Sequence, residues 1–311
     1  MKTSWGDLSV ADAHTHFFSH AFFAALAAQR GDSGADVETA VQEVTRILGW
    51  TTPPADPGEL AAIWARELDR HAVDRAALIA SVPGDEASVA AAIARFPERF
   101  YGYFMVNPLA PDAIERVEAA LETGLQGICL FPAMHRYAIG DGRVEKILQA
   151  AATYAGVVIF VHCGVLTVGV RRKLGLPSPF DMRYSNPIDL HPVALLNPKL
   201  NFVVPHFGAG YFREALMLCD LCSNVYLDTS SSNSWIRYQA PELELKAVFE
   251  CALDVVGAGR LLFGTDSSFF PRGWSAEVFH TQSKILADLG LGRDDAAAIL
   301  GGNLKRLLTR G

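Results

Sequence analysis

Short apolar runs, rich in β-branched and aromatic residues, recur along this 311-residue chain with helix-like stretches between them. Such runs are typical of parallel strands that are buried on both faces. Parallel strands need long crossover connections, and the alanine-rich amphipathic stretches between the runs can supply them. The pattern therefore predicts an α/β fold, a (β/α)₈ barrel. We expect its strands at 8–14, 73–81, 100–106, 126–131, 157–162, 201–206, 224–228 and 260–265.

Several of these runs end in a residue that can bind metal. The first closes on His14-Thr15-His16, two later ones on His162 and His206, and the last on Asp266. In a barrel, the carboxyl ends of all strands meet at one mouth, where catalysis takes place. A doubly wound open sheet is the competing fold, but it gathers its site at one switch point. Polar residues at so many strand ends favour the barrel.

Two segments are longer than ordinary loops. Residues 17–57 follow the first strand, and residues 163–187 follow the fifth. Long loops at the carboxyl face of a barrel usually shape the substrate pocket. We therefore expect one barrel domain over 1–311, with an insertion at 17–57 and long active-site loops after strands 1 and 5.

Composition narrows the classes of partner. Half of the residues are hydrophobic, a fifth are charged, and the formal net charge is −7. The negative charge argues against nucleic acid or an anionic membrane surface as the main partner, and leaves a small molecule as the expected one. No apolar segment near the start resembles a signal peptide, and no run reaches the ~20 residues of a membrane span. We expect a cytoplasmic protein, whose five cysteines do not indicate a disulfide framework.

The His-x-His pair is the first candidate for a metal site. Side chains alternate along a strand, so His14 and His16 point to the same side, with Asp12 one layer deeper. Each of these histidines alone would often be a hydrogen-bonded structural residue. Their occurrence together with His162, His206 and Asp266 at strand ends favours one shared metal site.

These residues together resemble the amidohydrolase superfamily, specifically its amidohydrolase 2 group, which includes aminocarboxymuconate-semialdehyde decarboxylase. The resemblance extends over nearly the whole chain. Besides the polar strand ends, it includes the segments 95–100, 106–108, 224–230 and 302–308.

The resemblance implies a mononuclear site in which His14, His16, His162 and Asp266 hold one divalent metal ion. Zinc is the favoured ion and manganese the alternative. His206 would act as acid or base beside a water that the metal activates, and Asp266 would also accept a proton. Binuclear relatives use a bridging lysine or glutamate on strand four. Here Cys129 and Phe131 occupy that segment, and neither can bridge two metals.

Several other charged residues are candidates for supporting roles. Arg171 and Arg183 on the loop after strand five, and Arg136 after strand four, are candidates to bind an anionic substrate. The alternative is a solvated loop face. Asp12 and Asp228 are candidates to support the ligands from behind, since carboxylates commonly orient metal-bound imidazoles, although Asp228 would equally suit a hydrogen bond at the barrel rim.

The expected function is metal-dependent hydrolysis of a small organic acid, lactone, ester or amide. A non-oxidative decarboxylase of a small unsaturated or aromatic carboxylic acid is the alternative that the same site would serve. A barrel that binds a ligand without catalysis is a third reading, which the retention of all five polar positions disfavours. The resemblance is compatible with a homodimer, since dimers are the commonest oligomers, but no residue in the sequence identifies an interface.

Overall fold

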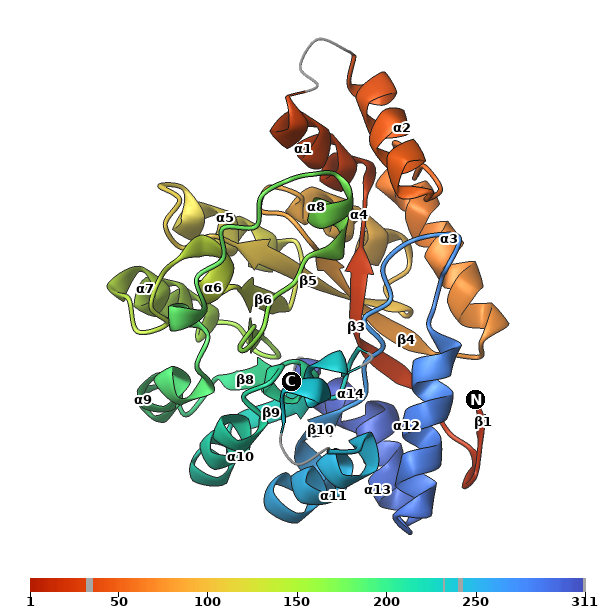
Figure 1. The fold of residues 1–311 in the computed structure, drawn as a ribbon, viewed down its shortest axis with the longest axis vertical. Coiled ribbons are helices and arrows are strands. Elements are labelled where there is room, and N and C mark those ends of the chain that lie inside the picture. The colour runs from red at the N-terminus through yellow and green to blue at the C-terminus, as the bar shows by residue number, and fades with distance from the viewer. Residues whose placement is uncertain (32–35, 232, 240–242, 310–311) are drawn as a thin grey trace.

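The computed structural model describes residues 1–31, 36–231, 233–239 and 243–309 (Figure 1). Its main sheet contains eight strands, which lie in the order of the chain and pair in parallel. They are β3 (Ala11–Phe17), β4 (Arg75–Ala80), β5 (Phe100–Val106), β6 (Gly127–Leu130), β7 (Val158–Val161), β8 (Asn201–Val204), β9 (Val225–Asp228) and β10 (Leu261–Leu262). The first and last strands meet, because Ala13 N–H donates to the Phe263 carbonyl at 2.8 Å and His16 N–H to the Ser267 carbonyl at 2.7 Å. The predicted (β/α)₈ barrel is confirmed.

Helices connect the strands and surround the barrel (Figure 1). They are α3 (Pro57–Arg70), α4 (Glu86–Arg95), α5 (Ala113–Glu122), α6 (Pro132–His135), α7 (Gly142–Ala151), α9 (His191–Leu196), α10 (Phe212–Leu221), α11 (Leu245–Val256), α12 (Ala276–Asp288), α13 (Arg293–Ala297) and α14 (Asn303–Leu308). Short 3₁₀ turns lie at η1 (Met182–Tyr184), η2 (Pro187–Leu190), η3 (His206–Gly208), η4 (Ser234–Tyr238) and η5 (Ala258–Arg260), and a π turn at η6 (Ala298–Gly302). A small antiparallel pair, β1 (Lys2–Thr3) with β2 (Gly6–Asp7), precedes the barrel. Among the helices of the described residues, none has the length and apolar character to cross a membrane.

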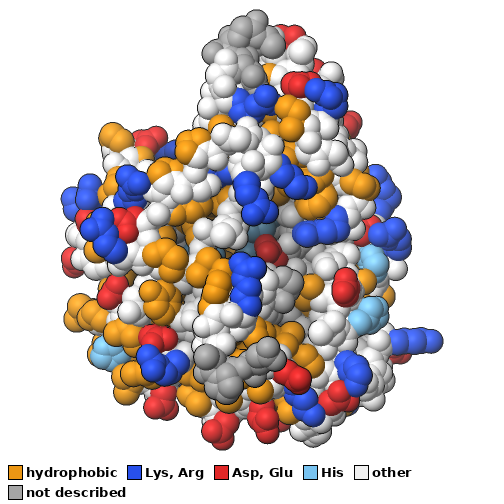
Figure 2. All heavy atoms as spheres, in the orientation of Figure 1, with side chains coloured by type: hydrophobic (Ala, Val, Ile, Leu, Met, Phe, Trp, Pro, Cys, Tyr) orange, Lys and Arg blue, Asp and Glu red, His pale blue; other side chains and the backbone are white. Residues whose placement is uncertain are grey.

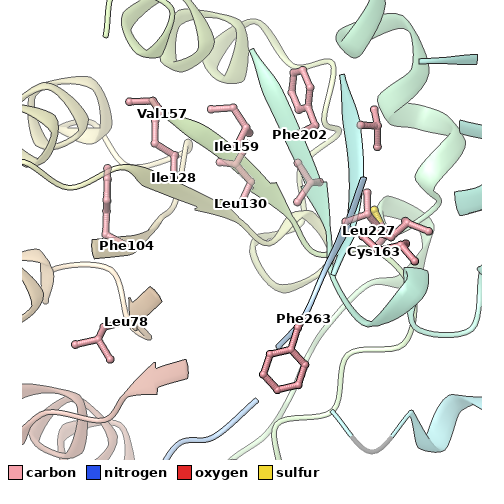
Figure 3. Packing of buried hydrophobic residues seen from close by; sticks show 14 of the residues in the cluster. Leu78, Phe104, Ile128, Leu130, Val157, Ile159, Cys163, Phe202, Leu227 and Phe263 are labelled. Carbon is pink, nitrogen blue, oxygen red and sulfur yellow. The ribbon is translucent and has the colours of Figure 1, made fainter. Parts of the chain in front are cut away.

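Alternating side chains divide the core into two layers. Ile128 and Leu130 of β6 belong to the cluster between the strands and the helices, together with Ile159 and Phe202 of the next two strands (Figure 3). Cys129, which lies between Ile128 and Leu130, belongs to the smaller cluster inside the barrel. This period of two explains why the strands read as continuous apolar runs, since both faces are buried.

A cap stands over one end of the barrel, consisting of α1 (His20–Arg30), α2 (Val37–Leu48) and α8 (Gly169–Lys173) (Figure 1). Its helices come from the two long segments after β3 and β7. Ser19 and Asp36 cap the first two helices by accepting hydrogen bonds from the N–H groups of Phe22 and Thr39. The cap has a hydrophobic cluster of its own, in which Phe23, Val41 and Val44 are buried.

Strand boundaries differ from the prediction at the two edges that meet. The first strand runs over Ala11–Phe17 instead of 8–14, so His14 and His16 lie within it. The last strand contains only Leu261–Leu262 instead of 260–265. A Cβ at Gly264 would lie 2.9 Å from the Cβ atoms of His14 and Ser230. A glycine is therefore needed where this segment passes the first strand.

Candidate metal centre

Three side chains form a compact group of metal donors at the mouth of the barrel. His14 and His16 extend from β3, and Asp266 follows β10; one donor atom of each lies within 4.8 Å of the others. His14 Nε2 and His16 Nε2 are 3.4 Å apart, and Asp266 Oδ1 lies 3.7 Å and 3.1 Å from them. Two ligands of one tetrahedral zinc ion, each about 2.0–2.1 Å from the metal, lie about 3.3 Å apart. The observed separations bracket this value, so the group fits a single cation.

His162 lies near this group without being part of it. It follows the last residue of β7, stacks on Phe131 at 5.4 Å, and lies 5.4 Å from the ring of His206. Its Nδ1 is buried and has no hydrogen-bond partner among the described residues. Burial, together with the neighbouring His206 and His14, holds the pKa of His162 well below its usual value. A buried, neutral imidazole with an unpartnered nitrogen suits a metal ligand.

Outer hydrogen bonds orient both histidines of β3. His14 Nδ1 lies 2.7 Å from Asp228 Oδ2, at the end of β9. His16 Nδ1 lies 2.7 Å from Ser81 Oγ, and this hydroxyl donates to the Ile79 carbonyl. The Ser81 oxygen therefore accepts from His16 Nδ1–H, which leaves the lone pair of Nε2 facing Asp266. Sequence reasoning missed Ser81, although it ends the run predicted as the second strand.

Two carboxylates support the group in different ways. Burial opposes ionisation of Asp228, but the charge of His14 and its hydrogen bond hold the pKa of Asp228 below its usual value. Asp12 is fully buried and accepts hydrogen bonds from the N–H groups of His14 and Thr265 and from the indole of Trp274. Burial raises its pKa to about 6. Asp12 thus touches the backbone of His14, not its ring, and joins β3 to the segment after β10.

His206 and Asp266 both lie on strained backbone beside the cavity. Neither is glycine, yet their φ angles are +55° and +59°. Such conformations cost of order 1–3 kcal/mol and occur often at functional sites. Burial and the neighbouring His14 lower the pKa of His206. Burial opposes ionisation of Asp266, but the neighbouring His16 and His14 hold the pKa of Asp266 well below its usual value.

His206 has one nitrogen engaged and one available. Its Nδ1 lies 3.2 Å from the Ser230 carbonyl and 2.9 Å from the Ser230 hydroxyl. A carbonyl only accepts, so Nδ1 carries the hydrogen and Nε2 carries the lone pair in the neutral ring. The Ser230 hydroxyl also lies 3.0 Å from His14 Nδ1, which links the two histidines.

A cavity of about 430 Å³ extends outward from these residues. Figure 2 shows carboxylate and histidine atoms at the bottom of a hollow, with Lys and Arg side chains around it. His14, His16, His162, His206 and Asp266 line one end. The wall beyond them is largely aromatic and aliphatic, with contributions from the cap. All five strand-end residues singled out in the sequence therefore face one cavity.

The structure does not bring the three candidate substrate arginines to this cavity. Arg183 is 84% exposed and pairs with Asp181 at 2.6 Å. Arg171 donates to the Pro177 carbonyl and Arg136 to the Pro179 carbonyl, so both stabilise the loop after β7. Among the described residues, the cations that line the cavity are Lys173, Arg237 and Arg272.

The chain belongs to the amidohydrolase family, whose sequence model matches residues 11–310. It is therefore an enzyme of that family. A curated relative, protein fluG of Emericella nidulans, is 36% identical over 87 residues, which are 28% of this chain. The match spans only 10% of the length of that relative.

Solved structures share the fold at low sequence identity. One is a probable 2-pyrone-4,6-dicarboxylic acid hydrolase from Acinetobacter baumannii with citric acid bound: TM-score 0.62, 13% identity, covering 97% of this chain and 99% of that one. Another is a mutant 5-carboxyvanillate decarboxylase from Novosphingobium aromaticivorans with bound manganese and a nitrobenzoic acid: TM-score 0.61, 14% identity, covering 99% of both chains. The first of these two structures thus contains a small organic acid, and the second contains manganese and a small organic acid.

Proposed function

We propose that this enzyme is a hydrolase that uses one divalent metal ion to cleave a small organic acid, lactone, ester or amide. The observation that carries the proposal is the compact donor group of His14, His16 and Asp266 at one end of a cavity that opens to the surface. We further propose that the barrel and the insertion at 17–57 work as one domain, since residues from both line that cavity.

His14, His16, His162 and Asp266 would hold the metal, and zinc suits this set of nitrogen and oxygen donors. Cys129 is buried inside the barrel and Phe131 stacks on His162, so strand four supplies no oxygen bridge for a second metal. When bound, a divalent cation supplies Lewis acidity, which lowers the pKa of water from ~15.7 toward ~7 and polarises an acyl oxygen.

His206 is the proposed acid and base. Its lowered pKa keeps the ring neutral near pH 7, and its Nδ1–H is held by Ser230, so Nε2 is free to accept a proton from water. The same nitrogen can then return that proton to the leaving oxygen or nitrogen. Asp266, ionised because of its histidine neighbours, is a second proton acceptor.

Decarboxylation is the second candidate, favoured by the structural similarity to the carboxyvanillate decarboxylase. In that reaction, His206 would deliver a proton to the carbon that loses carbon dioxide. The two reactions are distinguished by their products: a hydrolase releases an acid with an alcohol or amine, or opens a lactone, whereas a decarboxylase releases carbon dioxide.

Metal content and turnover together test the proposal. We expect about one zinc or manganese per chain in the purified protein by plasma mass spectrometry, and loss of metal in His162→Ala and Asp266→Ala. His206→Asn should keep its metal and lose about 10²- to 10⁴-fold in turnover on a panel of lactones, amides and aromatic acids. The exposed His280→Asn is the control. Full metal retention in both ligand variants, or near-normal turnover in His206→Asn, would contradict the assignment.

A further inference from the structure

The charges that line the cavity are unbalanced. Lys173, Arg237 and Arg272 are its cations, whereas Asp266 is its only carboxylate among the described residues. Under the proposed function, the charge of Asp266 is neutralised by the metal. The cavity is then strongly positive, in a protein whose formal net charge is −7. A positive cleft in an acidic protein attracts anionic ligands.

Of the three cations, Arg272 is the one that donates a hydrogen bond to the backbone of a metal donor. Its Nη2 donates to the Asp266 carbonyl at 2.9 Å and to Ser268 Oγ at 3.0 Å. These bonds tie the guanidinium to the segment that carries Asp266. Burial lowers the pKa of Arg272, which nonetheless remains charged at any physiological pH.

The guanidinium of Arg272 also lies against the last ring of a row of stacked aromatic side chains. Phe22 stacks on Phe18 at 4.0 Å and 2°, Phe18 on Trp50 at 5.9 Å and 19°, and Trp50 on Phe269 at 3.9 Å and 11°. The guanidinium carbon of Arg272 lies 4.8 Å from the centre of the Phe269 ring. The row therefore runs from the cap to the loop after β10, and Arg272 stands at its end.

Arg272 still has donors to offer. A guanidinium carries five N–H groups, and both hydrogen bonds of Arg272 to the described residues start from Nη2. The structure gives Arg272 no ion pair with a carboxylate of the described residues. Arg183, by contrast, is paired with Asp181. A fixed arginine with free donors at a cavity wall is suited to bind a carboxylate through two parallel hydrogen bonds.

We infer that Arg272 binds an anionic group of the substrate, apart from the group that reacts, and thereby selects acids over their neutral analogues. This inference rests on the proposed function for the location of the reacting group. Phe18, Trp50 and Phe269 line the same cavity as Arg272 with apolar surface, so the substrate carries an apolar portion next to its anionic group. Lys173, 5.7 Å from the Trp50 ring, adds to the attraction at the rim.

Calorimetric binding of benzene-1,3-dicarboxylate tests the inference, with the neutral benzene-1,3-dicarboxamide as the matched ligand. Four proteins would be titrated: wild type, Arg272→Gln, Arg272→Lys and the control Arg183→Gln. Each would be titrated as purified, with its metal content measured, and again after chelation. We expect Arg272→Gln to weaken binding of the dicarboxylate about 10- to 100-fold in both preparations. Arg272→Lys should lose less, Arg183→Gln should match wild type, and the diamide should bind all four weakly and alike.

The two preparations separate this inference from the proposed function. A protein that holds no metal would overturn the metal-dependent reaction, while the comparison of Arg272→Gln with wild type would still stand. Equal affinities of wild type and a folded Arg272→Gln would overturn the role of Arg272 whatever the metal content. No binding by wild type at millimolar dicarboxylate, or equal binding of the diamide, would overturn it too.

Discussion

Asp228→Asn replaces one oxygen of the carboxylate that contacts the ring of the metal donor His14. Asp228 is fully buried; its Oδ2 lies 2.7 Å from His14 Nδ1, and its Oδ1 accepts from Ser230 N–H at 2.6 Å. Both neighbours are donors, so both oxygens must accept. An asparagine has one acceptor, and either orientation of its amide places a donor against a donor.

The expected losses of stability and of metal affinity follow from this pairing of two donors. One buried donor without an acceptor costs about 1–3 kcal/mol, so the metal-free variant should unfold that much more easily. Removing the hydrogen-bond partner of a metal-binding imidazole typically weakens metal affinity 10- to 100-fold, which is about 1.4–2.7 kcal/mol. We expect both effects, because His14 loses its orientation in the metal-free and the metal-bound protein.

Urea unfolding of chelated protein and competition against a zinc-binding dye measure the two effects separately. Asp181→Asn, which changes a carboxylate outside the cavity, is the matched control. Wild-type zinc affinity in Asp228→Asn would refute the claim that Asp228 orients His14. Lower stability with normal zinc affinity would assign Asp228 to packing alone.

Two further predictions concern Ser81 and His135. Ser81→Ala removes the acceptor of His16 Nδ1–H and should weaken zinc binding about tenfold in the same dye assay. The control Ser234→Ala, at the wall of the same cavity, should bind zinc like wild type. Equal zinc affinities of Ser81→Ala and wild type would refute the assigned tautomer of His16. Burial lowers the pKa of His135 to about 4, below the value of about 6.5 in the unfolded chain, so folding expels a proton between these values and stability falls as pH drops from 6.5 toward 4. From pH 7 to pH 5, the free energy of unfolding measured in urea should fall by about 2 kcal/mol more in wild type than in His135→Gln. An equal fall in both proteins would exclude His135 as the cause.

The barrel was predictable because its signal is repeated. Each strand is buried on both faces and each helix on one, so eight successive units of the sequence show the same hydrophobic pattern. An error at one strand boundary therefore leaves the prediction of the other strands intact. The strand-end residues that line the cavity could also be predicted from the sequence, since the convergence of parallel strands follows from the fold alone. Strand limits at the closing edge were not, because they depend on the close passage of Gly264 past His14.

The residues that surround the metal donors were harder to predict. Ser81 and Ser230 act through the direction of a hydroxyl, which no spacing in the sequence reveals. Arg171 and Arg183 were predicted to bind an anionic substrate, yet Arg171 donates to the Pro177 carbonyl and Arg183 pairs with Asp181. Arg272 has no basic neighbour in the sequence, and its hydrogen bonds to Asp266 and Ser268 and its contact with Phe269 hold it at the cavity.

The cap has a hydrophobic cluster that is separate from the two clusters of the barrel. The barrel carries the metal donors and His206, whereas the cap carries Phe18, Phe22 and Trp50 on the cavity wall. The segment around α8 contributes Val170 and Leu174 to the cluster that α1 and α2 form, and Trp50 stacks on Phe269 after β10, so the cap is anchored to both of these loops. A change of the cap therefore alters the cavity wall while the strands keep the metal donors, and a graft that transfers this wall to a related barrel needs residues 17–57 together with α8 (Gly169–Lys173).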